Sequence, residues 1–600
     1  MKRCFVFLLA LLLLSASVLP LAAAAPQDSG VASVTVAIRD AVGKDTPGAA
    51  LLLFENGERV MYEGYGYADI ETRELVTAET LFELGELSSL FVTLAVAKLA
   101  EEGKLELDRD IAYYLPGDFC KELGLDYNIT LNNLLSSRAG FADRAFDLRY
   151  ENAALCFDTL QEALLADVPR QLAAPHAYTA YSPFGIALAA FVVECVAKMP
   201  YDAFVEETFL RPLGMTHTVL NAKNAPELKT AAGHCQKETG VFSVAAEKGR
   251  SYSALYPADG AISNIADLSV LLFFILNDEV GTEILSPGYR AMALERVFEN
   301  GVFQSGVAGL SACGTARGMT AHTPHFSASL AFDRAAGKAA LVLVNAPQSA
   351  VLALPARLCG LLEGIAVSPA GNLPDLRGFV GEYLPQGTAH VHLAAHVTKP
   401  LQVDAEGDKL SFGGRMLVQI APGVFADANG DKGVAVVQFL CSVEGEVLYV
   451  LTARGEVYRP AGFTESNVVQ ILLLVLLWVG VGYFLIGAVL HVVDAVRTRR
   501  DETLQPRPWR MVIPWVLAAT LALIVPIKAV ALSLGGGLFA SFMAATALIA
   551  LCVALAAALL FIFALFTAFT ERGMVARVAR SAGIYLLFLL ICWYWGVVSI

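Results

Sequence analysis

The sequence predicts an exported α/β protein: a mixed domain of strands and helices, then a small domain of short strands, then membrane helices. Between residues 47 and 103, a strand, a tight turn and a returning strand are followed by a long helix pattern. Residues 376–463 alternate short apolar stretches with Gly, Asp and Asn turns. Long apolar runs fill most of the C-terminal part. With 600 residues, the chain is also too long for a single core.

The first domain opens with a hairpin pattern. Residues 49–54 are continuously apolar, Asn56 and Gly57 form a favoured two-residue turn, and residues 60–62 return as the second strand. Residues 87–96 then carry apolar side chains at helical spacing, and Gly103 is a natural stop for that helix.

The first 25 residues predict a signal peptide. Lys2 and Arg3 give a positive start, residues 5–19 are apolar, and four alanines at 22–25 supply small residues for cleavage. The alternative is an uncleaved first membrane helix, which the short apolar run disfavours.

Four apolar runs predict a membrane region at 464–600: residues 468–493, 511–534, 538–569 and 584–600. The first three reach the roughly 20 residues that a bilayer requires, and the last is shorter. Arginines gather in the connections after the first and the third run, and such connections lie in the cytoplasm. We therefore expect a multi-pass protein of the cell membrane with its large N-terminal part outside.

Composition excludes some partners and cofactors. The net charge of −14 argues against nucleic-acid binding. The ten cysteines are scattered without metal-ligand spacing, and we expect those of the exported part to be mostly free and buried, with a disulfide between two of them left open. No metal site and no cofactor are predicted.

Several short sequence motifs resemble those of a known protein family. They include Leu-Leu-Ser-Ser-Arg-Ala-Gly at 134–140, Arg-Pro-Leu-Gly-Met-Thr-His-Thr at 211–218 and Asp-Gly-Ala-Ile-Ser-Asn at 259–264. With these phrases the chain resembles the serine β-lactamase-like family, which comprises class C β-lactamases, low-mass penicillin-binding proteins, D-aminopeptidases and related esterases. The resemblance implies a β-lactamase/transpeptidase-like α/β sandwich with a helical lobe at 31–365. A small β-barrel-like domain of the kind often appended to such hydrolases would follow at 374–463.

The same resemblance implies acyl transfer by a serine with a lysine three residues later, and here the chain departs from the family. The phrase Gly-Ser-x-x-Lys reads Gly85-Glu86-Leu87-Ser88-Ser89, so Glu86 holds the nucleophile position and Ser89 the lysine position. We expect Glu86 to be a helix-start residue whose pKa the helix dipole and free N–H groups lower. Ser88 and Ser89 lack an evident base, and a surface or capping role is expected for both.

Two further family elements are also altered. The Tyr-x-Asn element reads Tyr181-Ser182-Pro183, and the His-x-Gly strand reads His322-Thr323-Pro324. We expect Pro324 to remove an N–H from that strand and to fill the space that glycine leaves open. Tyr181 and His322 are expected to persist as walls of the former cleft.

Three functions remain open. The leading hypothesis is a membrane-anchored pseudoenzyme that binds a cell-wall peptide, a glycan fragment or an envelope protein without turning it over. The second is an active serine hydrolase with an atypical nucleophile. The third makes the membrane module the functional part, with the exported domain as a scaffold or sensor.

Overall fold

The computed structural model describes residues 30–500, apart from 142–148, 151, 167, 246–248, 302, 362–364, 367–372, 386–399, 430–433, 443–444, 453–456 and 463–466, and five positions beyond 500. The predicted signal peptide at 1–25 and nearly all of the second, third and fourth apolar runs lie outside these residues.

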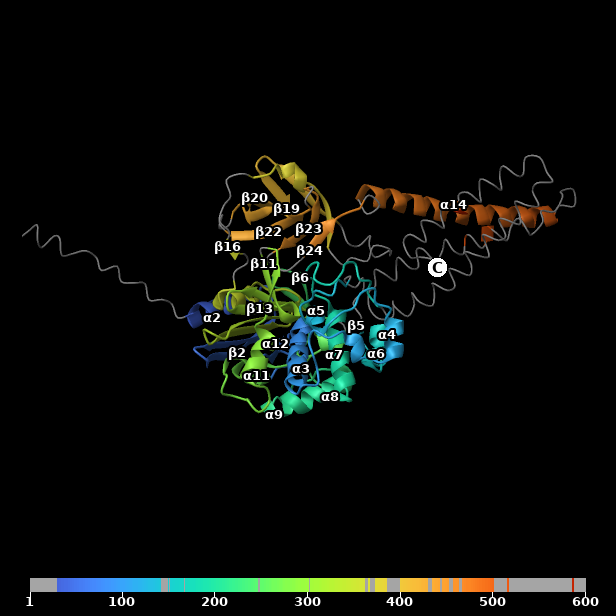
Figure 1. The fold of residues 1–600 in the computed structure, drawn as a ribbon. Coiled ribbons are helices and arrows are strands. Elements are labelled where there is room, and N and C mark those ends of the chain that lie inside the picture. The colour runs from blue at the N-terminus through green and yellow to red at the C-terminus, as the bar shows by residue number, and fades with distance from the viewer. Residues whose placement is uncertain are drawn as a thin grey trace, which may run out of the picture.

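A nine-stranded antiparallel sheet forms the centre of the first domain, in the order β10-β11-β12-β13-β14-β15-β1-β2-β3 (Figure 1). The early hairpin lies beside the late strands because β1 pairs with β15. The strands are β1 (Gly48–Glu55), β2 (Glu58–Asp69), β3 (Glu74–Leu75), β10 (Val297–Asn300), β11 (Phe303–Gly306), β12 (Ser311–Cys313), β13 (Ala316–His322), β14 (Ser327–Asp333) and β15 (Lys338–Val344).

The predicted hairpin is confirmed. Asn56 and Gly57 both have positive φ, of 52° and 79°, as a two-residue turn matched to the strand twist requires. β1 is continuously apolar because both faces of the sheet are covered. Leu51 and Leu53 pack on one side with α2 (Gly30–Ala41), whereas Leu52 and Phe54 pack on the other side into the main core.

Helices cover both faces. The main core holds α3 (Ser89–Glu101), α7 (Pro183–Ala197), α11 (Ile265–Leu276) and α12 (Pro287–Leu294), and the opposite face holds α2 and α13 (Leu354–Leu358). The predicted stop of α3 is confirmed, since Gly103 follows it with a φ of +67°. A helical lobe extends from one end of the sheet; it includes α4 (Gly117–Leu123), α5 (Leu131–Leu135), α6 (Leu160–Ala166) and α8 (Tyr201–Val205).

The second domain is an eight-stranded antiparallel barrel. Its strands run in the order β22-β21-β20-β19-β18-β17-β24-β23, and β23 pairs with β22 to close the ring. They are β17 (Gly381–Pro385), β18 (Leu401–Glu406), β19 (Lys409–Phe412), β20 (Arg415–Ala421), β21 (Val424–Asp427), β22 (Val434–Cys441), β23 (Val447–Thr452) and β24 (Val457–Pro460). The small β-barrel-like domain that the resemblance implies is thereby confirmed.

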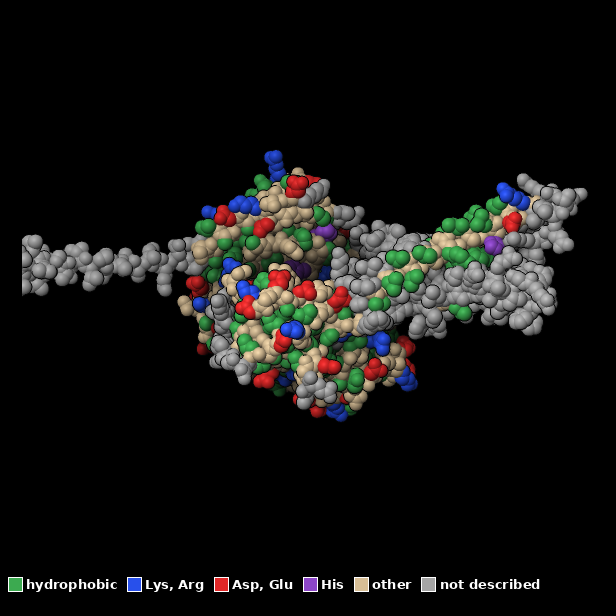
Figure 2. All heavy atoms as spheres, turned by 90° about the horizontal axis from the view of Figure 1, so that it is seen from above, with side chains coloured by type: hydrophobic (Ala, Val, Ile, Leu, Met, Phe, Trp, Pro, Cys, Tyr) green, Lys and Arg blue, Asp and Glu red, His purple; other side chains and the backbone are tan. Residues whose placement is uncertain are grey.

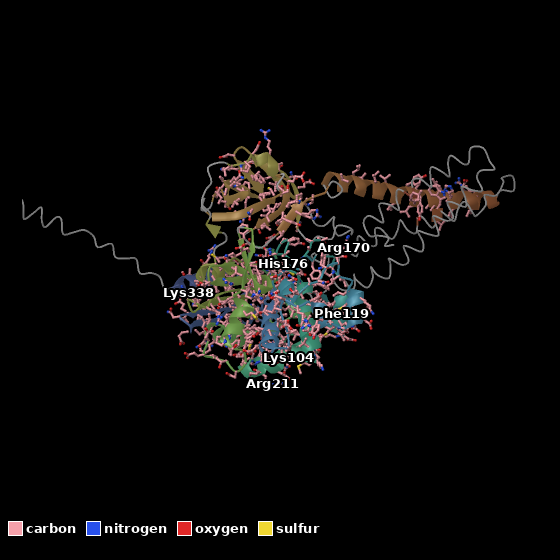
Figure 3. All side chains as sticks on the ribbon, viewed as in Figure 1. Lys104, Phe119, Arg170, His176, Arg211 and Lys338 are labelled. Carbon is pink, nitrogen blue, oxygen red and sulfur yellow. The ribbon has the colours of Figure 1, made fainter. Side chains whose placement is uncertain are left out.

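The barrel packs against the first domain through a shared apolar cluster. Tyr178 and Phe303 of the first domain join Ile420, Val424 and Leu451 of the barrel. The rings of Tyr178 and Tyr449 lie 5.3 Å apart. The segment that contains His176 and leads to the predicted site residue Tyr181 therefore lies beside the barrel (Figure 3).

Helix α14 (Asn467–Arg500) leads away from the barrel and contains the first predicted membrane run (Figure 1). Large apolar side chains such as Val479, Ile486 and Leu490 are exposed along it (Figure 2). Within the described residues, no single helix has both the length and the apolar character needed to cross a bilayer. A bent pair in the first domain, Pro183–Ala197 with Tyr201–Leu213, qualifies by length and composition alone.

Candidate functional site

The predicted site lies where a short turn of 3-10 helix, η1 (Gly85–Ser88), leads into α3 and faces the end of β13. Leu84 is right-handed helical and Gly85 is left-handed, with a φ of +56°. A Cβ on Gly85 would lie 3.1 Å from the O and 3.2 Å from the N of His322, so glycine lets the turn approach the strand closely.

Glu86 is partly buried and binds the strand opposite. Its Oε2 accepts a hydrogen bond from the backbone N–H of His322 at 2.8 Å, and its own N–H is a second donor to the carboxylate. Burial raises the pKa of Glu86, the two N–H groups oppose that rise, and nearby Asp259 adds to it. Our expectation of a lowered pKa is therefore wrong. The removal of water destabilises the charged carboxylate by more than the two backbone N–H groups stabilise it.

The hydroxyls of Ser88 and Ser89 are buried, which corrects the expected surface or capping role. Ser88 Oγ donates to the carbonyl of Gly85 at 2.6 Å and accepts from the N–H of Ala261 at 2.9 Å. Ser89 Oγ donates to the carbonyl of Glu86 at 2.7 Å and lies 3.2 Å from that of Ala308. Both hydroxyls thus hold neighbouring backbone segments together.

Tyr181 lies beside Glu86 and Ser89, so three of the predicted site residues lie together. Its hydroxyl donates to the carbonyl of Ala258 at 3.3 Å. Burial, and next the charge of Glu86, raises the pKa of Tyr181 well above its usual value. Because a Cβ on Gly309 would lie 2.5 Å from the tyrosine ring, glycine there leaves room for the ring.

Pro183 is the first residue of α7, and Ser182 caps that helix by accepting from the N–H of Gly185 at 3.1 Å. Proline suits this position because its fixed φ matches the helix and its missing N–H would have no partner there. The residue that the resemblance places at the family's asparagine position therefore starts a helix.

His322 is the last residue of β13, and its side chain is exposed. Its Nδ1 lies 2.8 Å from Ser327 Oγ, which in turn donates to the carbonyl of Pro347. Pro324 lies in the turn between β13 and β14, so our expectation that it removes an N–H from the strand is wrong. The Thr323 N–H closes that turn on the carbonyl of Phe326 at 2.8 Å.

A buried group of three charged residues lies next to the site, and the sequence analysis did not predict it. Arg149 Nη2 lies 2.8 Å from Asp259 Oδ2, and its Nη1 lies 3.7 Å from Glu83 Oε2. The N–H of Ser251 donates to Glu83 Oε1 at 2.9 Å, yet burial still raises the pKa of Glu83. The three charged residues come from segments far apart in the chain, so no local spacing could reveal the group.

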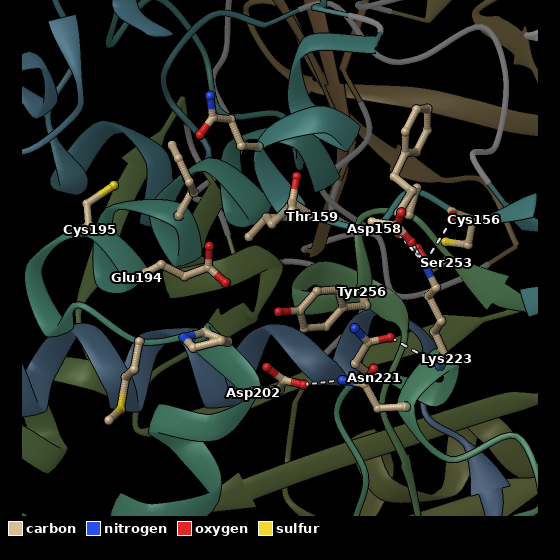
Figure 4. A pocket seen from close by; sticks show the side chains of 18 of the residues that line it. Cys156, Asp158, Thr159, Glu194, Cys195, Asp202, Asn221, Lys223, Ser253 and Tyr256 are labelled. Carbon is tan, nitrogen blue, oxygen red and sulfur yellow. Dashed lines mark hydrogen bonds and ion pairs between the residues drawn. The ribbon is translucent and has the colours of Figure 1, made fainter. Parts of the chain in front are cut away.

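A cavity of about 550 Å³ lies in the helical lobe, and none of its lining residues is a predicted site residue. Glu194, Asp202 and Tyr256 face it (Figure 4). Much of its polar lining is bonded within the lobe: Glu194 Oε1 accepts from the Tyr201 N–H at 2.8 Å, and Asn224 Nδ2 donates to Asp202 Oδ2 at 2.7 Å. Burial raises the pKa of Glu194.

Over the part of the chain that the structure describes, His, Cys, Asp and Glu form no group of three or more that could hold a metal ion. Among the described residues, the seven cysteines from Cys120 to Cys441 are free thiols, as expected, but only Cys156 and Cys359 are buried, and Cys441 is exposed.

Comparison with known proteins assigns the first domain. The family model described as Beta-lactamase matches residues 34–358. Protein flp of Staphylococcus aureus (strain N315) is 29% identical over 204 residues, which are 33% of this chain and 40% of flp. The "Putative D-alanyl-D-alanine carboxypeptidase" of Escherichia coli (strain K12) is 27% identical over 275 residues, or 38% of this chain and 60% of that protein. The chain thus spans less than two thirds of these curated relatives.

A solved structure, described as the crystal structure of SurE, matches with a TM-score of 0.54 and 20% identity. The match covers 72% of this chain and 99% of that one, and at this identity it supports the fold alone.

Proposed function

Because the chain belongs to the Beta-lactamase family, we propose that it is a non-hydrolytic member that binds a ligand or partner at the cell envelope. The observation that supports this proposal most is that the two serine hydroxyls are buried and hydrogen-bonded to the backbone. Family chemistry needs a hydroxyl that a nearby base activates. Ser88 and Ser89 are buried and donate to backbone carbonyls, and the nucleophile position holds the carboxylate of Glu86.

The ligand that we propose is a cell-wall peptide or an envelope protein. The Escherichia coli relative is named as a putative D-alanyl-D-alanine carboxypeptidase, and this name supports a peptide as the ligand of a related site. Tyr181 and His322 remain beside Glu86 as polar groups for such a ligand. Neither a metal nor a cofactor enters this proposal.

We also propose that the protein is exported and held in the membrane by its C-terminal helices. The signal-like start, the arginine-bearing connections and the exposed apolar side chains of α14 support this placement. The alternative that the membrane module is itself the functional part stays open.

The test is covalent labelling of the purified full-length chain with a labelled penicillin and with a fluorophosphonate. We expect no lasting adduct by intact mass measurement, because the chain lacks an activated hydroxyl. Equilibrium binding of the same penicillin, measured alongside, reports non-covalent recognition. Ser88→Ala and Ser89→Ala variants are the matched controls. A stoichiometric mass shift that either variant abolishes would overturn the proposal in favour of an active serine hydrolase.

A further inference from the structure

The cavity in the helical lobe combines the features of a small-molecule binding site. Its volume of about 550 Å³ lies within the usual range for pockets that hold small ligands. Part of its lining is apolar and includes Phe157, Phe191 and Met199. Such pockets bind by burying an apolar body and orient the ligand through a few converging polar groups.

The polar groups of this cavity come from three elements that the tertiary fold brings together. Glu194 belongs to α7, Asp202 to α8 and Tyr256 to α10 (Tyr256–Asp259), and all three side chains face the cavity (Figure 4). The Tyr256 hydroxyl is a hydrogen-bond partner of the Glu194 carboxylate. Next to Tyr256, with the two rings 6.1 Å apart, the Tyr201 hydroxyl is fully buried and has no hydrogen-bond partner among the described residues.

The lysine that lines the cavity is already bound elsewhere. Lys223 Nζ donates to the carbonyl of Phe157 at 2.8 Å and lies 2.6 Å from Asp158 Oδ1. Its positive charge is therefore compensated by Asp158. Over the part of the lining that the structure describes, the carboxylates of Glu194 and Asp202 are left without an ion-pair partner.

These two carboxylates receive neutral hydrogen-bond donors only. Glu194 Oε1 accepts from the Tyr201 N–H at 2.8 Å, and Asp202 Oδ2 accepts from Asn224 Nδ2 at 2.7 Å. Burial raises the pKa of Glu194, and the negative charge of Asp202 adds to that rise. A positively charged group between the two carboxylates would remove this repulsion and return charge-assisted hydrogen bonds.

We propose that this cavity binds a small organic ammonium ion, whose NH₃⁺ group donates to Glu194, Asp202 and the Tyr256 hydroxyl and whose short apolar body lies against Phe191 and Met199. An ammonium group has three donors, which matches these three acceptors. A metal ion fits less well, because the described residues form no group of three metal-ligating side chains. The cavity shares no residue with the Glu86 site, so this inference is independent of the proposed function.

Titration calorimetry of the purified full-length chain with n-butylammonium tests the proposal. We expect saturable binding with a dissociation constant on the order of 1 mM, which suits so small a ligand. 1-Butanol has the same size but no charge, and it should bind at least about tenfold more weakly. Sodium chloride keeps the ionic strength equal in both titrations.

Two substitutions of nearly equal shape remove the charges. Glu194→Gln and Asp202→Asn keep an oxygen for the Tyr201 N–H and for Asn224, so the lobe should stay folded. Each should weaken n-butylammonium binding by about tenfold, because a hydrogen bond to a charged group is lost. Glu122→Gln, at an exposed position of α4 in the same lobe, is the matched control and should bind as the unchanged chain does.

A cysteine of the lining reports where the amine binds without any substitution. Cys195 lines the cavity and is partly exposed, whereas Cys441 lies exposed on the barrel. Saturating n-butylammonium should slow the modification of Cys195 by 2-aminoethyl methanethiosulfonate, measured by peptide mass, and leave that of Cys441 unchanged. Absence of saturable binding, equal affinity for 1-butanol, or an unprotected Cys195 would overturn the inference. The penicillin experiment probes another site, so either result can fail without the other.

Discussion

At the residue scale, Glu86 shows how burial can reverse an expectation drawn from local position. A glutamate at a helix start, with free N–H groups nearby, is normally stabilised in its charged form. Here the surrounding protein removes enough water to raise the pKa instead, and Asp259 acts in the same direction. The residue that the resemblance places at the nucleophile position is thus a carboxylate whose charged form is disfavoured by its surroundings.

Glu86→Gln should become more stable than the unchanged chain as pH rises. The folded protein binds the Glu86 proton more tightly than the unfolded chain, whose carboxyl titrates near 4.5. The stability that this group contributes is therefore complete below about pH 4.5 and is lost as pH rises through the folded-state pKa. Glutamine still offers an oxygen to the His322 N–H but carries no charge, so it escapes this loss.

Denaturant unfolding of both chains between pH 4 and pH 8 measures the effect. The difference in unfolding free energy should grow with pH, by about 1.4 kcal/mol for each unit of pKa difference, and then level off. Glu58→Gln, at an exposed position on β2, is the control and should show no such growth. A constant difference across the range would contradict the assignment.

At the element scale, the segment that leads into α7 connects the site to the barrel. Tyr178 is buried against barrel residues on one side, and its hydroxyl lies 3.5 Å from the carbonyl of Gly140. Three residues later, Tyr181 lies beside Glu86 and Ser89. The barrel therefore helps to fix the wall of the candidate site.

Tyr178→Ala should lower the unfolding free energy by about 3 kcal/mol, because it removes a buried aromatic ring from the contact between the two domains. Calorimetry of the full-length chain would show a lower transition temperature. Leu448→Ala, on the exposed side of β23, is the matched control and should change stability by less than about 0.5 kcal/mol. Equal effects of the two substitutions would show that the contact adds nothing to stability.

At the scale of the whole molecule, the two folded domains precede α14, and the remaining apolar runs follow it. The proposed topology has four spans that begin outside the membrane, and it returns the chain to the outside, because each span reverses the side. A reporter fused after Ile600 should therefore be active outside the cytoplasmic membrane. A cytoplasmic signal would mean that one run does not span, and the short run at 584–600 would be the first to examine.

The sequence by itself determined the features that depend on neighbouring residues. The Asn56-Gly57 turn, the buried β1 strand and the end of α3 at Gly103 follow from local propensity and spacing. The expectation that the Ser-x-x-Lys pair is absent also came directly from the sequence, because the resemblance places both positions in one short motif. The Beta-lactamase family assignment agrees with the resemblance.

Only the tertiary structure decided the properties that depend on distant residues. The barrel closes because β22 pairs with β23 as well as with β21. Short strands such as β24 form only through such pairing with strands distant in the sequence. The direction of the Glu86 pKa depends on burial and on Asp259, and the carboxylate's partner, His322, lies 236 positions away. Desolvation and long-range hydrogen bonds are properties of packed neighbours, and a linear sequence does not specify which residues become neighbours.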